Sequence, residues 1–387
     1  MISSEQSLEL FTAHFGGQAD VVVHSPGRVN LIGEHVDYNA GLVLPMAIDR
    51  GTTLAARHAA GRKVRVWSEP FAQLDEFDLD RPKTAGKHEW SNYVRGVAAL
   101  LIEAGVAVPG AEVSISSDLP VGGGLSSSAS LEVGSAMALL ALAGATMDPV
   151  AIAKLCQQAE HKFAGVPCGL MDQFAVVFGK AGHALRMDCR SLEIQHVPCD
   201  HEAIAWAIID SKAPRRLAAS GYAKRRKECD KSLAILRKAG LAVESLRDVT
   251  VEMLEEHEDR LGETLARRVR HVVTEIGRVA EGSEYLALGR YDLFGRLMFA
   301  SHRSLAADYE VSIAELDHIV ATGDDTLGVY GCRMTGGGWG GCAISVLAVE
   351  AVRFFEERVS ASYAKQFGHP LGYLVARPAD GARVEKR

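Results

Sequence analysis

The sequence lacks the features that mark several large classes of protein. Its 387 residues include seven cysteines but no CxxC pair, so we expect reduced thiols rather than a disulfide or zinc framework. Forty-two basic residues against forty-nine acidic ones leave no positive excess. This balance argues against a general binder of nucleic acid or of an anionic membrane.

No segment of the sequence predicts a membrane span or a cleaved leader. The longest apolar stretch, at residues 133–147, is rich in alanine and glycine and is shorter than the ~20 residues that cross a bilayer. The first residues carry Glu5 and Glu9 and lack a basic start followed by an apolar run. We therefore expect a cytoplasmic protein.

The length and the patterning predict a two-domain α+β protein, because 387 residues exceed one compact core of ordinary size. Alternation and apolar runs predict strands in 50–66 and 113–116, and at 204–210, 342–347 and 371–375, the last strand of the chain. Helices are expected at 126–142, 149–163, 216–238 and 349–365, and over much of 251–320. The first domain should cover 1–200 and a helix-rich second domain 201–387.

Glycine is abundant, at 38 residues, and three glycine-containing segments stand out. Residues 119–130 read Leu-Pro-Val-Gly-Gly-Gly-Leu-Ser-Ser-Ser-Ala-Ser and lie between a predicted strand and a buried helix. Glycines let backbone N–H groups approach a ligand, and the helix directs its positive end to the same place. The segment favours phosphate binding, although it is not a P-loop or a hydrolase elbow. A plain Gly/Ser turn is the alternative.

Residues 333–342, Arg-Met-Thr-Gly-Gly-Gly-Trp-Gly-Gly-Cys, formally contain G-x-G-x-x-G. A strand follows where a dinucleotide fold needs a helix, so a Rossmann oxidoreductase is disfavoured. We interpret the segment as a backbone hairpin that approaches a bound group, with a ligand-free β-turn as the alternative.

Residues 25–39 hold Arg, Asn, Glu, His, Asp and Tyr side chains around an apolar Leu31-Ile32 pair. So many hydrogen-bonding groups suit a polyhydroxyl ligand, whose donors and acceptors must each be matched. A solvated loop would explain the polarity but not the apolar pair in its middle.

Two acids allow either a functional or a structural reading. Glu160 falls in the last turn of its predicted helix, where a negative charge is unfavourable; Mg²⁺ would compensate it, and so would His161 and Lys162. Asp172, among apolar neighbours, is either a helix cap or a carboxylate kept for chemistry. The basic run at 224–227 is interpreted as a solvated helix face.

Taken together, the three segments closely resemble the galactokinases of the GHMP family of small-molecule kinases, over nearly the whole chain. The first motif, 27–38 continuing to 41–45, is the galactokinase-specific one, whereas 120–130 and 335–341 match motifs shared across the family. The resemblance implies a two-domain GHMP kinase fold of mixed sheets and helices, with the active site in the cleft between domains. It also implies ATP- and Mg²⁺-dependent phosphorylation of α-D-galactose at its C1 hydroxyl.

The resemblance assigns roles to individual positions. Asp172 looks like the catalytic base, and Arg28 like the residue beside the anomeric oxygen and the γ-phosphate. Ser128 and Glu160 look like the magnesium ligands. The sugar-binding residues implied are Glu34, His35, Val36, Asp37, Gly169 and Tyr222. The nucleotide-binding residues implied are Ser68, Gly122, Gly123, Gly124, Leu125, Ser126, Ser127 and Ser128.

Departures from the family pattern are small. Val36 stands where threonine is usual and Trp339 replaces phenylalanine, but no proposed reacting group is lost. An N-acetylgalactosamine kinase and a non-catalytic galactose sensor remain alternatives, although sensors lack residues in the stretch that is intact here at 128–130. We expect a monomer or weak homo-oligomer that binds D-galactose and ATP, and neither nucleic acid nor membrane.

Overall fold

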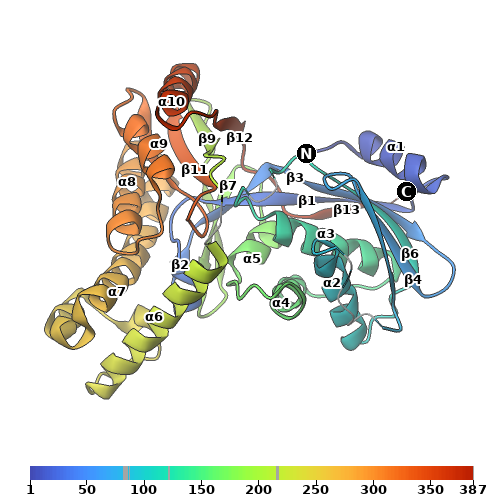
Figure 1. The fold of residues 1–387 in the computed structure, drawn as a ribbon, viewed down its shortest axis with the longest axis horizontal. Coiled ribbons are helices and arrows are strands. Elements are labelled where there is room, and N and C mark those ends of the chain that lie inside the picture. The colour runs from blue at the N-terminus through green and yellow to red at the C-terminus, as the bar shows by residue number, and fades with distance from the viewer. Residues whose placement is uncertain (82–85, 87, 121–122, 215–217, 387) are drawn as a thin grey trace.

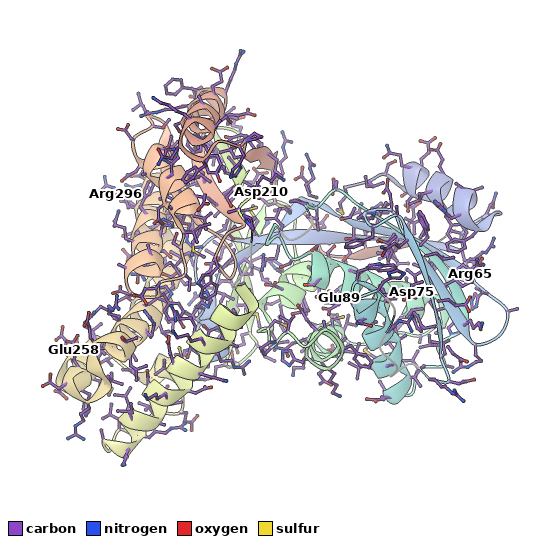
Figure 2. The ribbon with its side chains drawn as sticks, in the orientation of Figure 1. Arg65, Asp75, Glu89, Asp210, Glu258 and Arg296 are labelled. Carbon is purple, nitrogen blue, oxygen red and sulfur yellow. The ribbon has the colours of Figure 1, made fainter. Side chains whose placement is uncertain are left out.

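The computed structural model describes residues 1–81, 86, 88–120, 123–214 and 218–386. Two α+β parts lie side by side, with the first sheet and α1–α5 on the right of Figure 1 and α6–α10 on the left. Figure 2 shows Arg65 and Glu89 on the first part and Glu258 and Arg296 on the second, with Asp210, at the end of β9, between them.

The first sheet has the strand order β13-β1-β3-β6-β4-β5. Its strands are β1 (Val21–Asn30), β3 (Pro45–His58), β4 (Lys63–Ser68), β5 (Gln73–Asp78), β6 (Ala111–Ser117) and β13 (Arg383–Lys386). Its helices are α1 (Ser4–Phe15), α2 (Ser91–Glu103), α3 (Ser127–Leu142), α4 (Pro149–Ala159) and α5 (Met171–Phe178).

Strand alternation explains why this sheet is covered on both faces. Val21 and Val23 of β1 pack in the core that contains α2 and α3, whereas Val22 packs with Phe11 of α1. Since successive side chains point to opposite faces of a strand, β1 is buried along its whole length. Figure 1 shows α1 on one side of the sheet and α2 and α3 on the other.

The second part contains a sheet of order β10-β11-β9-β12, and a small third sheet of order β2-β7-β8 contacts β3 of the first sheet and α7. These strands are β9 (Ile204–Asp210), β10 (Val329–Met334), β11 (Cys342–Ala348), β12 (Gly372–Ala376), β2 (Leu42–Val43), β7 (His183–Asp188) and β8 (Ile194–Pro198). The helices are α6 (Ala218–Lys238), α7 (Val251–Ala287, broken at Gly262), α8 (Tyr291–Ala307), α9 (Ala314–Asp324) and α10 (Val352–Phe367).

A shared hydrophobic core joins the two parts. Val29 and Leu44 from the first part pack in one cluster with Trp206 of β9, Ile344 of β11 and Phe294 of α8. Apolar burial across this boundary fixes how the two halves meet.

Most of the predicted elements are confirmed. Asp148 caps α4 by accepting a hydrogen bond from the Ala151 N–H, and Pro149 occupies the first helical position, as expected. The helix continues as a π-helical segment, Glu160–Ala164, and ends at Gly165. The strand at 204–210 has the predicted bounds, and residues 216 and 217 of the helix predicted at 216–238 lie outside the described residues.

The prediction that the strand at 371–375 is the last one is wrong. β13 follows it and pairs with β1, from Val21↔Lys386 to His24↔Arg383. The end of the chain therefore returns to the first sheet, an arrangement that local sequence patterns cannot predict because a four-residue edge strand carries little signal. The boundary near residue 200 stays a prediction.

No helix in the described part of the chain is both long and apolar enough to span a membrane.

Candidate active site

All three glycine-containing segments meet at one cavity of about 260 Å³. Predicted site residues that line it are Arg28, Glu34, His35, Asp37, Gly124, Ser126, Ser127, Ser128, Glu160, Asp172 and Tyr222. Gly336 and Gly337 of the third segment complete the same wall. Residues more than 300 positions apart thus converge, which supports one ligand-binding site rather than three separate turns.

Arg28 and Asp172 form the central ion pair of the cavity. The Arg28 Nε–H donates to Asp172 Oδ1 at 2.8 Å, Nη2 donates to Oδ2 at 2.7 Å, and Nη1 donates to the Gly124 carbonyl at 2.8 Å. This bidentate geometry fixes both side chains, and only arginine can supply it. Arg28 therefore connects the candidate base with the glycine loop.

Asp172 lies in the first turn of α5, but Leu170 is the N-cap residue. The carboxylate of Asp172 instead accepts hydrogen bonds from Arg28 and from the Ser126 hydroxyl. Asp172 is thus not the cap of α5, and its reading as a carboxylate kept for chemistry stays a prediction.

The glycine–serine loop passes directly into α3. Ser126 has a left-handed conformation (φ 57°, ψ 46°), which turns the chain so that α3 begins at Ser127 beside the cavity. Unpaired N–H groups at a helix start, together with the helix dipole, favour an anion. This end of the helix faces the cavity, and its role in binding a ligand stays a prediction; Gly122 lies outside the described residues.

The third segment is the connection between the antiparallel strands β10 and β11, as predicted. Gly336, Gly338, Gly340 and Gly341 all have φ between 83° and 117°. Glycine adopts such angles without steric cost, so this backbone can approach the cavity closely.

Glu34 holds the connection in place from within the core. Its Oε1 accepts the Gly336 N–H at 2.9 Å, and its Oε2 accepts the Asn30 amide at 2.8 Å. Arg333, fully buried, pairs with Oε2 at 2.5 Å. Burial raises the pKa of Glu34, and Arg333 opposes that rise. Glu34 thus joins the first motif to the third, besides lining the cavity.

His35 is buried, with a positive φ of 63°. Its Nδ1 lies 2.9 Å from the Tyr38 hydroxyl and its Nε2 lies 3.1 Å from the Gly337 carbonyl oxygen. Burial lowers the pKa of His35 to about 3, so the ring is neutral.

Asp37 faces the cavity from a short 3₁₀ turn, Asp37–Asn39. A side chain at Gly169 would lie 1.7 Å from Asp37 Oδ2, so only glycine leaves room for this carboxylate. Gly169, predicted as a sugar contact, therefore shapes the site by contact with Asp37. Burial raises the pKa of Asp37 to about 6, and the negative charge of Asp172 adds to the rise.

This pKa predicts pH-dependent sugar binding. As the pH falls through about 6, Asp37 takes up a proton and loses acceptor capacity, so galactose, the ligand that the sequence resemblance implies, should bind about tenfold more weakly at pH 5 than at pH 7. Calorimetric titration with galactose in the absence of nucleotide measures this. The Glu160→Gln variant should keep the same dependence, and a flat affinity between pH 5 and 7 would contradict it.

The raised pKa of Asp37 also affects the free energy of unfolding, with the opposite sign from the lowered pKa of a salt-bridged acid. The folded chain binds the Asp37 proton more tightly than the unfolded chain, so this group's contribution to the free energy of unfolding falls as the pH rises from about 4 to about 6. The site retains a carboxylate here at a cost in stability, as functional groups often do.

Glu160 lies at the start of the π-helical segment and is buried. Burial, and then the charge of Asp172, raise its pKa to about 7, while hydrogen bonds from Cys168, Ser128 and Gln173 act in the opposite direction. The carboxylates of Glu160 and Asp172 repel one another, so a bound cation would be stabilised between them. A hydroxyl oxygen and a carboxylate oxygen are ligands that suit Mg²⁺.

The predicted magnesium ligands Ser128 and Glu160 line the same cavity and their side chains are hydrogen-bonded to each other, so their oxygens fit the ion. Among the described residues no group of three or more His, Cys, Asp and Glu side chains could hold a metal. A magnesium ion that shares its coordination with substrate phosphates needs only one or two protein carboxylates.

A second cavity, of about 600 Å³, meets the first at Ser127 and Ser128. Ser68, predicted near the nucleotide, lines it, as do Glu89 (labelled in Figure 2), Trp90, Tyr93 and Phe71. The two cavities therefore share the start of α3.

Some predicted positions are not brought to the cavities. Of the site residues that the structure describes, Val36, Gly123, Leu125 and Gly169 lie outside both linings. Val36 and Leu125 are core side chains, because their neighbours in the motif, not they, face the ligand side. The sequence argument missed Cys168, Val166 and Met171 in the first cavity and the aromatic wall of the second. Aromatic residues are scarce in this chain, so the occurrence of Phe71, Trp90 and Tyr93 within a short stretch was the one signal that could have indicated this wall.

The domain families that match the chain define its class. Residues 92–180 match the "GHMP kinases N terminal domain" and residues 283–365 match the "GHMP kinases C terminal" family. A mevalonate kinase from Methanococcus jannaschii, 19% identical, shares the fold with a TM-score of 0.63 over 93% of this chain and 98% of that one. Fold and site thus define a two-domain GHMP kinase, a class that uses ATP.

More similar proteins narrow the class. Residues 9–58 match the "Galactokinase galactose-binding signature". A galactokinase from Roseiflexus sp. (strain RS-1) is 42% identical over 98% of this chain and 97% of its own length, and the Homo sapiens galactokinase is 43% identical over 97% and 94%. The Lactococcus lactis galactokinase complexed with galactose has a TM-score of 0.93 and 37% identity, over 97% of this chain and 98% of that one. The chain belongs to the galactokinase family.

Proposed function

We propose that this protein transfers the γ-phosphoryl group of ATP to the C1 hydroxyl of α-D-galactose, giving galactose 1-phosphate and ADP. One observation carries the proposal: the polar residues of the galactose-binding signature line the same cavity as the Arg28–Asp172 pair and the start of α3. The similarity to the galactose complex supports the choice of sugar.

In this proposal the sugar lies against Asp37, Glu34, His35 and Tyr222. A carboxylate accepts hydrogen bonds from two hydroxyls of a pyranose, and Asp37 has the room for this that Gly169 leaves. Burial raises the pKa of Tyr222 well above its usual value, so its hydroxyl stays protonated and can donate.

Asp172 accepts the proton of the attacking C1 hydroxyl. Both of its oxygens are oriented by Arg28; Oδ2 also accepts the Ser126 hydroxyl, whereas Oδ1 retains a lone pair for the C1 hydroxyl. Arg28 stabilises the charge that develops around the transferred phosphoryl group, and the N–H groups at the start of α3 act in the same way. Most of the rate enhancement then comes from positioning and charge stabilisation.

The nucleotide occupies the second cavity, beside Ser68, with its phosphates at Ser127 and Ser128. The Ser128 hydroxyl and the Glu160 carboxylate would hold Mg²⁺ there. When bound, the ion supplies neutralisation of the charge on the phosphate oxygens of ATP. We also propose that the protein acts in the cytoplasm as a monomer or weak homo-oligomer.

The magnesium assignment makes a quantitative prediction. Glu160→Gln should raise the free Mg²⁺ concentration for half-maximal turnover at least about tenfold, since changes to groups that merely orient metal ligands already cost that much. Calorimetry should show the same loss for Mg²⁺-dependent nucleotide binding. Glu132→Gln is the matched control, because Glu132 is buried beside Glu160 and shares Gln173 as hydrogen-bond donor, but lies outside the cavity lining. Equal Mg²⁺ requirements in wild type and Glu160→Gln would contradict the assignment.

The function is tested by ADP release with ATP and Mg²⁺ across galactose, N-acetylgalactosamine, glucose, mevalonate and no acceptor. We expect the fastest turnover with galactose and a 1-phosphate product. Faster turnover with N-acetylgalactosamine would keep the kinase site and overturn the choice of sugar. No turnover on any acceptor, with galactose still bound, would instead support a galactose sensor.

A further inference from the structure

The connection between α8 and α9, residues 308–311, contacts both the first and the third motif from outside the cavity. Its Val311 carbonyl accepts the Trp339 N–H at 2.7 Å, in the middle of the glycine-rich connection between β10 and β11. The Tyr309 ring centroid lies 4.9 Å from that of His35. Tyr309 is fully buried and lies outside the cavity lining.

A line of hydrogen bonds runs from the core to the cavity through Tyr309. Its hydroxyl lies 3.1 Å from Cys229 Sγ and 2.9 Å from the Tyr38 hydroxyl. The Tyr38 hydroxyl lies 2.9 Å from His35 Nδ1, and His35 Nε2 lies 3.1 Å from the Gly337 oxygen. The line therefore ends on the backbone of the third motif, in the wall of the sugar cavity.

The chemistry of its last acceptor gives this line a direction. A carbonyl oxygen can only accept, so Nε2 of the neutral His35 ring carries the hydrogen and Nδ1 is the acceptor. Tyr38 then donates to His35, Tyr309 donates to Tyr38, and Cys229 donates to Tyr309. Each hydroxyl has one hydrogen, so reversing one bond also reverses the bonds between it and His35. His35 Nε2 would then carry no hydrogen, and its lone pair would face a lone pair of the Gly337 oxygen.

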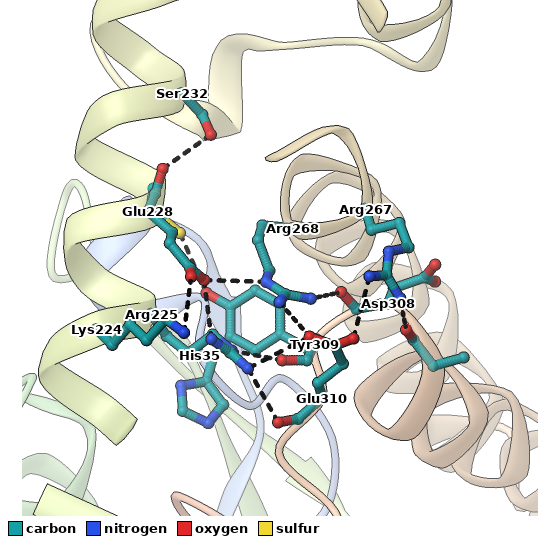
Figure 3. A network of polar contacts seen from close by, with 12 residues as sticks. His35, Lys224, Arg225, Glu228, Ser232, Arg267, Arg268, Asp308, Tyr309 and Glu310 are labelled. Atoms are coloured by element: carbon teal, nitrogen blue, oxygen red, sulfur yellow. Dashed lines mark hydrogen bonds and ion pairs between the residues drawn. The ribbon is translucent and has the colours of Figure 1, made fainter. Parts of the chain in front are cut away.

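Two arginines fix the backbone of the same connection, as Figure 3 shows. Arg225 Nε donates to the Tyr309 carbonyl at 2.5 Å and its Nη2 to the Glu310 carbonyl at 3.1 Å. Arg268 Nη1 donates to the Asp308 carbonyl at 2.5 Å, and its Nε to Glu228 at 3.0 Å. These bonds hold Tyr309 between α6 and α7.

Arg225 also connects Tyr309 to α6, the helix that carries the cavity-lining residue Tyr222. It lies three residues after Tyr222 on α6, and residues three apart share a helix face. Tyr309 is thus connected by its hydroxyl to His35 and Gly337, and by its carbonyl to the helix that carries Tyr222.

We infer that Tyr309 is a positioning residue for the sugar site: acting through Tyr38, it holds the His35 ring and the Gly337 carbonyl in the arrangement that the sugar meets. The inference rests on the proposed function. Without the Tyr309 hydroxyl, His35 and the glycine-rich connection would have to be ordered when the sugar binds, and that ordering costs affinity.

The test is Tyr309→Phe, which keeps the ring and the backbone carbonyl and removes the hydroxyl alone. We expect the KM for galactose to rise about tenfold, the cost of ordering one or two side chains on binding. The kcat and the KM for ATP should stay within about twofold, because interactions made equally in ground and transition states affect KM alone.

The matched control is Tyr363→Phe, which also removes a buried tyrosine hydroxyl. Tyr363 is fully buried in α10 and donates to the Ser211 carbonyl, outside the cavity lining. Both variants should lower the melting temperature, and only Tyr309→Phe should raise the galactose KM. Equal galactose KM values in the two variants and the wild type would overturn the inference, because Tyr309 would then be merely a core residue.

A second pair of variants tests the direction of the line. Cys229→Ser keeps a donor toward Tyr309 and Cys229→Ala removes it, so the galactose KM of the serine variant should be nearer to that of the wild type. The opposite order would overturn the directed line. The wild-type acceptor panel is measured first, so that failure of the proposed function is seen there and not confused with failure of this inference.

Discussion

Asp172→Asn should lower the kcat for galactose phosphorylation about a thousandfold, within the range that general-base catalysis contributes. The asparagine side chain has nearly the same shape but no longer accepts a proton from the C1 hydroxyl. Galactose affinity should change by only a few-fold, since Asp37, Glu34 and His35 are untouched. Steady-state turnover and calorimetric binding of galactose measure the two effects separately.

The control for this variant is Asp188→Asn. Asp188 also forms a bidentate pair with an arginine, Arg247, at 2.6 and 2.7 Å, but outside both cavities. Losing that pair should lower stability and leave kcat near that of the wild type. If Asp172→Asn retained turnover within tenfold of the wild type, Asp172 would not be the base.

Arg28→Lys should lower kcat about a hundredfold, the lower end of what losing one preorganised donor to a transition-state charge costs. Lysine keeps the positive charge, but a single ammonium cannot hold both Asp172 oxygens and the Gly124 carbonyl at once. The expected loss is therefore due to geometry rather than net charge. The KM for galactose should change by only a few-fold.

Arg247→Lys is the matched control, since it breaks the same kind of bidentate pair at a distance from the cavities. It should affect the melting temperature and leave kcat nearly unchanged. Comparable kcat losses in the two lysine variants would mean that Arg28 acts through general stability and not at the phosphoryl group.

The three motifs could be assigned from the sequence because their chemistry is local. A Gly-Gly-Gly run before a buried helix indicates an anion site wherever the helix ends up, and Asp148-Pro149 begins a helix by its own capping chemistry. Likewise glycine permits the positive φ values of Gly336, Gly338, Gly340 and Gly341, whereas the positive φ of Trp339 among them is not explained by residue type.

Other features depend on neighbours that are distant in sequence. Val36 belongs to a polar motif, yet its side chain packs in the core, because the tight turn at 37–39 directs its neighbours and not Val36 to the cavity. The aromatic wall around Ser68 comes from two separate segments, Phe71 between β4 and β5 and Trp90 and Tyr93 at the start of α2, which only the tertiary structure brings together. β13 exists because β1 offers it an open edge.

By itself the sequence determined the class of fold, the elements and the types of chemical group available, because propensity, capping and glycine geometry act over a few residues. The tertiary structure alone decided which of those groups meet. Arg28 binds Asp172 across 144 residues, His35 meets Gly337 across 302, and Tyr309 reaches the sugar site from a connection with no motif of its own. Such pairings are set by how the two cores pack together, and burial then shifts the pKa values of Asp37 and Glu160.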